Sequence, residues 1–206
     1  MAETRADRVY MQTEKRLSLI LSGDEGVVRG QLASLRKGAG RKPGDDPKTW
    51  GILFSQLPED MLGRYGFPSK EEWAIHTALT LFAVHQQGND PKGKNMNQPG
   101  ISLGLAAAKL VMIECGDDLS RIAEARERVG RRFHQIVLAS DMDAMSYYLR
   151  GFITLLRSNE IGLDYPMLAK DIYRYQLPGG DASVRLKWGQ DFYRVEKKDE
   201  TSGKDE

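Results

Sequence analysis

The fold is constrained most by the stretch from Pro99 to Arg157, which has the apolar spacing of three successive helices. In residues 119–139 one helical face collects Ile122, Val129, Phe133, Ile136 and Val137. In the following helix the corresponding face collects Met145, Tyr148, Phe152, Ile153 and Leu156. We expect both faces to be buried, so that this half of the chain is built by packing helix on helix.

Arginines occupy another face of the helix predicted over residues 119–139. Arg121, Arg128 and Arg132 are spaced i, i+7 and i+11, which places them within about 40° of one another around the helix axis. Arg131 lies beside this stripe. Because Arg128 and Arg131 each have a glutamate four residues earlier, part of this charge is expected to be paired locally. The stripe is still a candidate surface for a polyanion.

Three more arginines in this stretch affect how far the basic surface extends. Arg150 and Arg157 are seven residues apart on the next predicted helix, opposite its apolar face. Arg126 instead projects toward the apolar side of its own helix. We expect either that Arg126 extends its guanidinium to the surface or that Gly130 kinks the helix and makes the stripe less regular.

The rest of the chain also carries helical signals. Ser69 and Glu72 form a capping box before a segment that is apolar nearly all round, which predicts a central, buried helix. Asp164, with Pro166 in the first turn, and Asp181 are the predicted N-caps of the last two helices. The final helix repeats Val184, Trp188, Phe192 and Val195 on one face. Further helices are predicted over residues 4–21, 24–36, 49–57 and 58–65, and the central helix is predicted over residues 70–87.

We therefore predict an all-α fold, a compact multi-helix bundle made of two packed helical lobes. Residues 1–198 are expected to form a single domain, with lobes at about 1–90 and 97–195 and a polar loop at 88–99 between them. The charged tail at 199–206 is expected to be disordered. The 206 residues are 40% hydrophobic and 29% charged, which lies in the globular range and not in the disordered one.

The localisation of the protein is predicted from the first residues and from the length of the apolar runs. The first residues lack the apolar stretch of a signal peptide, and no run of about 18 uncharged apolar residues is present. The single Cys115 excludes an intramolecular disulfide and suits a reducing compartment. We expect a cytoplasmic protein that does not contact a membrane.

The net charge of +1 does not indicate a nucleic-acid binder, so only the distribution of charge is informative. Residues 29–42 contain no acidic residue and five basic ones, which are Arg29, Arg36, Lys37, Arg41 and Lys42. Lys92 and Lys94 lie at the tip of the loop at 88–99. From the residues alone, nucleic-acid binding and a purely protein-binding adaptor remain open. A helix-turn-helix regulator is less well supported, because no recognition helix after a tight turn can be singled out.

Two motifs resemble those of enzymes but lack the required context. Gly100 to Gly104 matches the G-x-S-x-G pattern of serine hydrolases, yet no strand precedes it, so we expect Ser102 to cap a helix. Gly88 to Asn95 is one residue short of a Walker A loop and has Asn95 where a magnesium-binding hydroxyl is needed. Neither motif supports a catalytic site.

Metal and acid–base chemistry are also poorly supported. Three histidines and one cysteine do not form a ligand cluster, and His76 is interpreted as a core histidine. The carboxylate pairs at 45–46 and 117–118 are expected to cap turns and helices. We predict no enzymatic activity, no metal and no cofactor.

A series of sequence blocks resembles a known family. In order, they are RGQLASLRKGAGRKP, TALTLFAVHQQ, GISLGLAAAKL, RRFHQIVLAS, YYLRGFITLLR, IGLDYPMLAKDIYRYQ and SVRLKWGQDFYR. Each block is moderately specific, but their order and spacing from about Val28 to Arg194 resemble the CasB family. This family is the small subunit of the type I-E CRISPR surveillance complex, Cascade.

The resemblance implies an all-helical, non-enzymatic protein that is present as a head-to-tail pair in the complex. Its expected partners are the crRNA, the target DNA including the displaced strand, the backbone and large subunits of Cascade, and a second copy of itself. It would stabilise the R-loop by sequence-independent contacts to nucleic-acid backbones. We expect the self-association surface along the apolar faces of the terminal segments. The alternative is a structural spacer whose arginines meet only other proteins.

The predicted nucleic-acid-binding residues come from two sources. The resemblance carries over, by position, Arg29, Arg36, Lys37, Lys92, Lys94, Arg131, Arg132 and Arg150. Charge placement adds Arg41, Lys42, Arg121, Arg128 and Arg157.

Overall fold

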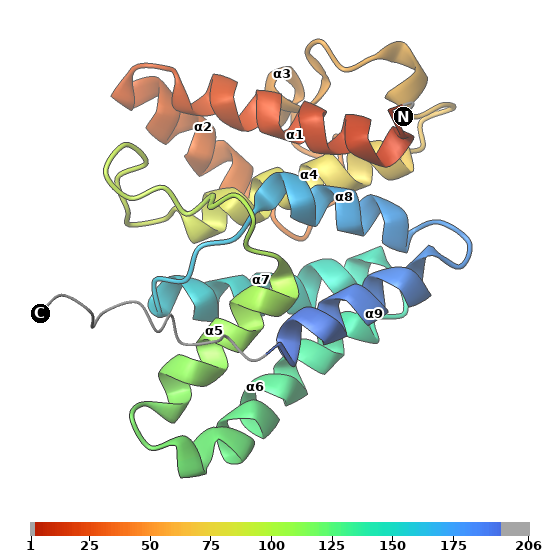
Figure 1. Cartoon of the computed structure of the whole chain (residues 1–206). Helices are drawn as coiled ribbons and strands as arrows, with labels where there is room; N and C mark the ends of the chain where they lie inside the picture. Colours follow the sequence, from red (N-terminus) through yellow and green to blue (C-terminus); the bar gives the residue numbers. More distant parts are fainter. Residues whose placement is uncertain (1–2, 195–206) are drawn as a thin grey trace, which may run out of the picture.

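The computed structural model describes residues 3–194, and in this range it consists of helices, turns and loops (Figure 1). The α-helices are α1 (Arg5–Leu21), α2 (Glu25–Gly38), α3 (Trp50–Phe54), α4 (Lys70–His85), α5 (Leu103–Cys115), α6 (Ile122–Val137), α7 (Met142–Ser158), α8 (Tyr165–Tyr175) and α9 (Gly180–Phe192). Short 3-10 helices cover Pro47–Thr49, Glu59–Met61 and Leu119–Arg121. The predicted all-α fold is confirmed.

Helix α4 lies at the centre of the molecule. The predicted capping box is present, because the Glu72 amide donates to the Ser69 hydroxyl (3.0 Å) and the Ser69 amide donates to the Glu72 carboxylate (2.7 Å). Every residue of α4 except Lys70 and Trp73 is buried. The helix packs against α1, α2, α7 and α8, as its uniformly apolar surface requires.

Helix α8 connects parts of the chain that are distant in sequence. It packs along α1 and α4 and also contacts α9, so that in Figure 1 it lies between α1 and the group formed by α5, α6, α7 and α9. Buried apolar side chains from both halves form one continuous core. Because α8 follows the predicted lobe boundary at 88–99 and packs on helices that precede it, chain order alone does not define the two packed groups. The division into two lobes stays a prediction.

Polar side chains at the starts of helices fix the loops around this core. The Asp164 carboxylate caps α8 by accepting from the Met167 amide (2.8 Å) and also accepts from the Gly100 amide (2.8 Å). The Ser102 hydroxyl accepts from the Leu105 amide (3.2 Å) and donates to Asp191 (2.6 Å). The predicted caps at both positions are confirmed.

The start of α9 differs from the prediction. Gly179, in the left-handed region with φ of 71°, is the N-cap, and Asp181 lies in the first turn of the helix. Glycine adopts positive φ without a steric penalty, so the turn can close before Asp181 is reached. Val184, Trp188 and Phe192 are buried as predicted, whereas Val195 and the tail at 199–206 lie outside the described residues.

The helix predicted over residues 119–139 also begins differently. Leu119–Arg121 is a 3-10 turn capped by the Asp118 carboxylate, and α6 then continues through Gly130 as one helix. The guanidinium of Arg126 lies 5.5 Å from the ring centre of Tyr193, which agrees with extension toward the surface and not with a kink. Within residues 3–194, the helices are too short or too polar to cross a membrane.

Candidate nucleic-acid interface

The predicted basic residues do not form a single patch. Some line one of two hollows on the surface, and others are paired with carboxylates. Arg29, Arg36 and Lys92 line one groove, and Arg132 and Arg150 line a second hollow. Arg128, Arg131 and Lys94 are paired with carboxylates.

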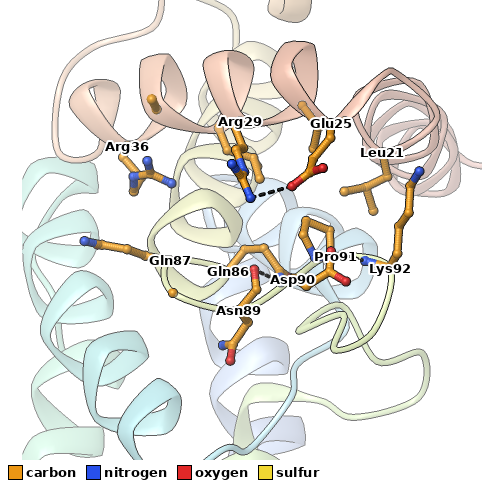
Figure 2. Close-up of a pocket in the computed structure, with 14 residues that line it drawn as sticks. Leu21, Glu25, Arg29, Arg36, Gln86, Gln87, Asn89, Asp90, Pro91 and Lys92 are labelled. Carbon is orange, nitrogen blue, oxygen red and sulfur yellow. Dashed lines mark hydrogen bonds and ion pairs between the residues drawn. The ribbon is translucent and has the colours of Figure 1, made fainter.

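The first site, which we call the α2 groove, lies between α2 and the loop at 86–92 and has a volume of about 660 Å³. Figure 2 shows Arg29 and Arg36 extending from α2 on one side and Lys92 from the loop on another. Its apolar lining comes from Leu21, Val28, Leu32, Ala33 and Pro91. Arg29 pairs with Glu25 on the same helix, but both side chains are more than two-thirds exposed, so this pair contributes little stability. The groove thus presents three cations and two carboxylates, those of Glu25 and Asp90, over an apolar floor.

Hydrogen bonds hold the loop that forms one side of this groove. The Asp90 carboxylate accepts from the amides of Lys92 (3.2 Å) and Gly93 (3.1 Å). The Gln86 amide group donates to the carbonyl of Lys94 (2.8 Å) and accepts from the amide of Met96 (2.9 Å). The loop is therefore fixed at both ends, and this fixes the backbone that carries Lys92.

Lys94 is directed away from Lys92 although only Gly93 lies between them in the sequence. Its ammonium group pairs with Glu160, just after α7, at 2.5 Å. The predicted basic tip of the loop thus contributes one lysine to the groove and uses the other to anchor the loop beside the end of α7.

Arg150 and Arg157 project from one face of α7 and reach the ends of two other helices. Arg150 Nη1 donates to the carbonyl of Ala39 (3.0 Å), directly after α2. Arg157 Nη1 donates to the carbonyl of Val84 (3.2 Å) and to Gln87 Oε1 (3.0 Å), at the end of α4. Unpaired carbonyls at helix C-termini attract cations, so both contacts stabilise the packing. A guanidinium has five N–H donors, so others remain available.

The second site, which we call the α6–α7 hollow, has a volume of about 780 Å³. Helix α6 contributes Arg132 and Gln135, and α7 contributes Tyr147, Tyr148, Arg150, Gly151, Phe152, Thr154, Leu155 and Ser158. None of these lining residues is acidic. Because α6 packs on α7, two arginines that are distant in sequence face one hollow.

The arginine stripe on α6 is divided by its neighbours. Arg128 binds two carboxylates, Glu114 of α5 (3.1 Å) and Glu124 (2.6 Å), and is about one-third exposed. Arg131 pairs with Glu127 at 2.9 Å. The pairing at i, i+4 spacing is therefore confirmed for both arginines. Arg121 ends the 3-10 turn and is exposed.

Lys37, Arg41 and Lys42 are exposed around the turn that follows α2. The backbone of this turn is held by His76, whose Nε2 lies 3.3 Å from the Gly38 carbonyl and 3.2 Å from the Arg41 carbonyl. Burial lowers the pKa of His76, so its ring is uncharged at neutral pH. The Nε2–H group then donates a hydrogen bond to these carbonyl oxygens. The interpretation of His76 as a core histidine is confirmed.

Sequence reasoning missed three residues of these sites. Gln87 lines the α2 groove and binds Arg157, which places Arg157 beside that groove. Tyr147 and Tyr148 line the α6–α7 hollow, although the apolar spacing indicates only a packing role for Tyr148. The i, i+3 spacing of Tyr147 and Arg150 is the signal that places them on adjoining positions of one helix surface.

The enzyme-like motifs have structural roles here. Ser102 is a helix cap, with its hydroxyl bonded to Asp191, and a loop precedes it. Asp46 and Asp118 accept from backbone amides at the starts of 3-10 helices, as predicted for these carboxylates. Among residues 3–194 no group of three or more His, Cys, Asp or Glu side chains is arranged to hold a metal ion.

Comparisons with known proteins agree with this architecture. No curated protein matches the sequence. The crystal structure of CasB from Thermobifida fusca is similar, with a TM-score of 0.66 and 29% identity over 92% of this chain and 97% of that one. A Cse2-family CRISPR-associated protein from Thermus thermophilus has a similar fold, with a TM-score of 0.60 and 21% identity over 92% and 98% of the two chains. The family described as CRISPR-associated protein Cse2 matches residues 31–193, so the chain belongs to the Cse2, or CasB, family.

Proposed function

We propose that this protein is a non-catalytic small subunit of the type I-E CRISPR Cascade complex in the cytoplasm. In this role it binds the backbones of crRNA and target DNA without reading their sequence. The observation that carries the proposal is that α7 links two hollows, each of which is lined by two or more cations. Arg150 lines the α6–α7 hollow, and Arg157, about 10 Å further along the helix, binds Gln87 of the α2 groove.

The physical role follows from the balance of R-loop formation. The RNA–DNA heteroduplex is about as stable as the DNA duplex that it replaces, so modest contacts to a backbone shift the equilibrium. A displaced strand held on a positive surface is less available to pair again with the target strand. Arginine and lysine contacts to phosphates supply affinity without sequence preference.

The other partners in this proposal are the backbone and large subunits of Cascade and a second copy of the chain. A net charge of only +1 leaves most of the surface suited to protein contacts. Exposed apolar side chains near both ends of the described chain, such as Leu19 (57%) and Leu186 (63%), are candidates for self-association.

A second candidate function is that of a structural spacer. This alternative is favoured because three of the predicted cations form ion pairs within the chain and are less available to phosphates. They are Arg128, Arg131 and Lys94. In this alternative, the remaining arginines contact acidic patches on other subunits and not phosphates.

Binding to single-stranded DNA, duplex DNA and RNA across a salt series separates the two functions. We expect binding that is independent of sequence and falls steeply with salt. Changing Arg29, Arg36 and Arg132 together to Ala should lower the slope of log affinity against log salt by about 2 for single strands, or about 0.7 per lost contact. The residual affinity at low salt should fall as well.

The control removes the same charge elsewhere. Lys15, Arg64 and Lys70 are exposed cations outside both hollows, and their joint replacement by Ala should leave the slope unchanged. If the wild-type protein binds no nucleic acid at low salt but enters the assembled complex normally, the spacer function replaces the proposed one.

A further inference from the structure

Tyr147 is a largely exposed aromatic side chain on α7, the helix that carries Arg150. It is 73% exposed, although α7 is otherwise amphipathic and buries its apolar face against α4 and α6. A single exposed tyrosine is common on protein surfaces and by itself indicates nothing. The side chains around Tyr147 make this position unusual.

A second tyrosine supports the ring of Tyr147. The ring centres of Tyr147 and Tyr148 are 5.5 Å apart with an interplanar angle of 73°, an edge-to-face arrangement. Tyr148 is half-buried and packs against the core. Edge-to-face pairs are favourable, so Tyr148 restrains Tyr147 while most of the Tyr147 ring stays in contact with solvent.

Two arginines share the hollow with this ring. Arg132 and Arg150 line the same hollow, and its lining contains no carboxylate. Arg132 makes no ion pair with another residue of the described range 3–194, in contrast to Arg128 and Arg131 on the same helix. Arg150 is fixed by its bond to the Ala39 carbonyl, which pre-orders the side chain.

The hollow therefore combines an open aromatic face with two cations. A volume of about 780 Å³ is in the range of sites that take ligands of nucleotide size. Exposed aromatic rings in basic grooves bind single strands because every base has a π-face that can stack on them. In a duplex, the faces of the bases are already stacked on one another. The α2 groove has cations but no aromatic side chain in its lining.

We propose that the α6–α7 hollow is a stacking site for one unpaired base of single-stranded nucleic acid. The base packs on Tyr147, and Arg132 and Arg150 bind the phosphates on either side of it. Gln135 also lines the hollow, and its amide group can hydrogen-bond a base edge. This inference rests on the proposed function and adds to it a preference for single strands.

The test compares Tyr147→Ala with Tyr147→Phe in the purified full-length chain. The probe is a single-stranded oligodeoxynucleotide that carries 2-aminopurine, whose fluorescence falls when it stacks. Loss of one stacked base should weaken single-strand binding by about five- to hundredfold and remove part of the quenching. The Phe variant keeps a ring and should bind as the wild type does. Duplex binding should not change.

The salt series identifies the source of the lost affinity. Tyr147→Ala removes no charge, so the slope against log salt should stay as in the wild type, whereas Arg132→Ala should lower it by about 0.7. Tyr65→Ala is the matched control, because Tyr65 is 93% exposed and lies outside the hollow. Its replacement should change neither affinity nor quenching.

Each other outcome overturns the stacking site in a distinguishable way. If Tyr147→Ala binds like the wild type with a steep salt slope, stacking is excluded and the proposed function stands. Equal weakening by Ala and Phe assigns the effect to the hydroxyl group. If polyglutamate binds the hollow as tightly as the oligonucleotide and needs only the arginines, the occupant is an acidic protein. Absence of any nucleic-acid binding removes both the stacking site and the proposed function.

Discussion

His85 is a buried titratable residue that makes the stability of this fold depend on pH. It ends α4, is fully buried, and its Nδ1 lies 2.9 Å from the hydroxyl of Tyr165 on α8. Burial lowers the pKa of His85 to about 4, whereas an unfolded chain has a histidine pKa of about 6.5. The unfolded state therefore binds more protons than the folded state between these two values, and the folded protein loses stability as the pH falls through this window.

We expect the free energy of unfolding of the wild type to fall by about 3 kcal/mol more than that of His85→Gln between pH 7 and pH 4. The variant lacks the group whose protonation favours unfolding. Urea titrations followed by circular dichroism at several pH values measure the difference. His134→Gln is the matched histidine replacement at an exposed position of α6. Parallel stability curves for the wild type and His85→Gln would contradict the argument.

Residue types and spacing predicted which cations to consider but not what each cation binds. The pairing of Arg131 with Glu127 follows from i, i+4 spacing and was predictable. The contact of Arg128 with Glu114 depends on how α5 packs against α6, and the contact of Arg150 with Ala39 joins residues that are distant in sequence. Tertiary packing decides such partners, so helical periodicity alone cannot assign them.

At the scale of helices, one carboxylate joins α8 to α9. Asp171 is buried and accepts hydrogen bonds from Trp188 Nε1 (2.9 Å) and from Lys187 Nζ (2.7 and 2.9 Å). Trp188 is itself fully buried. The contact satisfies an indole N–H that has no access to water and pairs the buried charge with a partly exposed lysine.

Replacement of Asp171 by Ala should lower the free energy of unfolding by about 2–4 kcal/mol, because it leaves the Trp188 N–H and the lysine without their partner. Thermal unfolding followed by tryptophan fluorescence measures the effect. Asp181→Ala is the matched control on α9, since Asp181 pairs with Arg185 at 3.3 Å in a more exposed position. We expect the control to change stability by less than about 1 kcal/mol. Equal effects of the two changes would show that Asp171 does not join the helices in this way.

Helix boundaries were predictable where a local cap determines them. Ser69 with Glu72, Ser102, and Asp164 each bond to an amide within three residues, so the sequence contains the whole interaction. The predicted start of α9 was wrong because Gly179 takes a left-handed conformation, which depends on the turn that leaves α8. The 3-10 turn at Leu119–Arg121 was missed because its residues fit a regular helix equally well.

For the whole molecule, the packing of α8 on α1 and α4 is the contact that the sequence did not reveal. The predicted lobes followed chain order, whereas α8 covers helices from the beginning of the chain. An ion pair supports this contact, because Lys170 Nζ of α8 lies 2.6 Å from the Asp7 carboxylate of α1. Apolar faces show that a helix needs a partner but not which partner it takes.

The packing of α1 on α8 has a consequence for the order in which the protein is made. On the ribosome, residues 5–21 emerge well before residues 165–175, so at about 5–20 residues per second α1 waits on the order of ten seconds for α8, the helix against which it packs most extensively, although α4 emerges earlier. A nascent chain arrested after Ser158 should therefore be cleaved by protease within residues 5–21, and a fully released chain should be protected there. Equal protection would mean that α1 docks before α8 is synthesised. If the expected result holds, the buried side chains of α1, such as Val9 and Ile20, stay accessible to chaperones until α8 has been made.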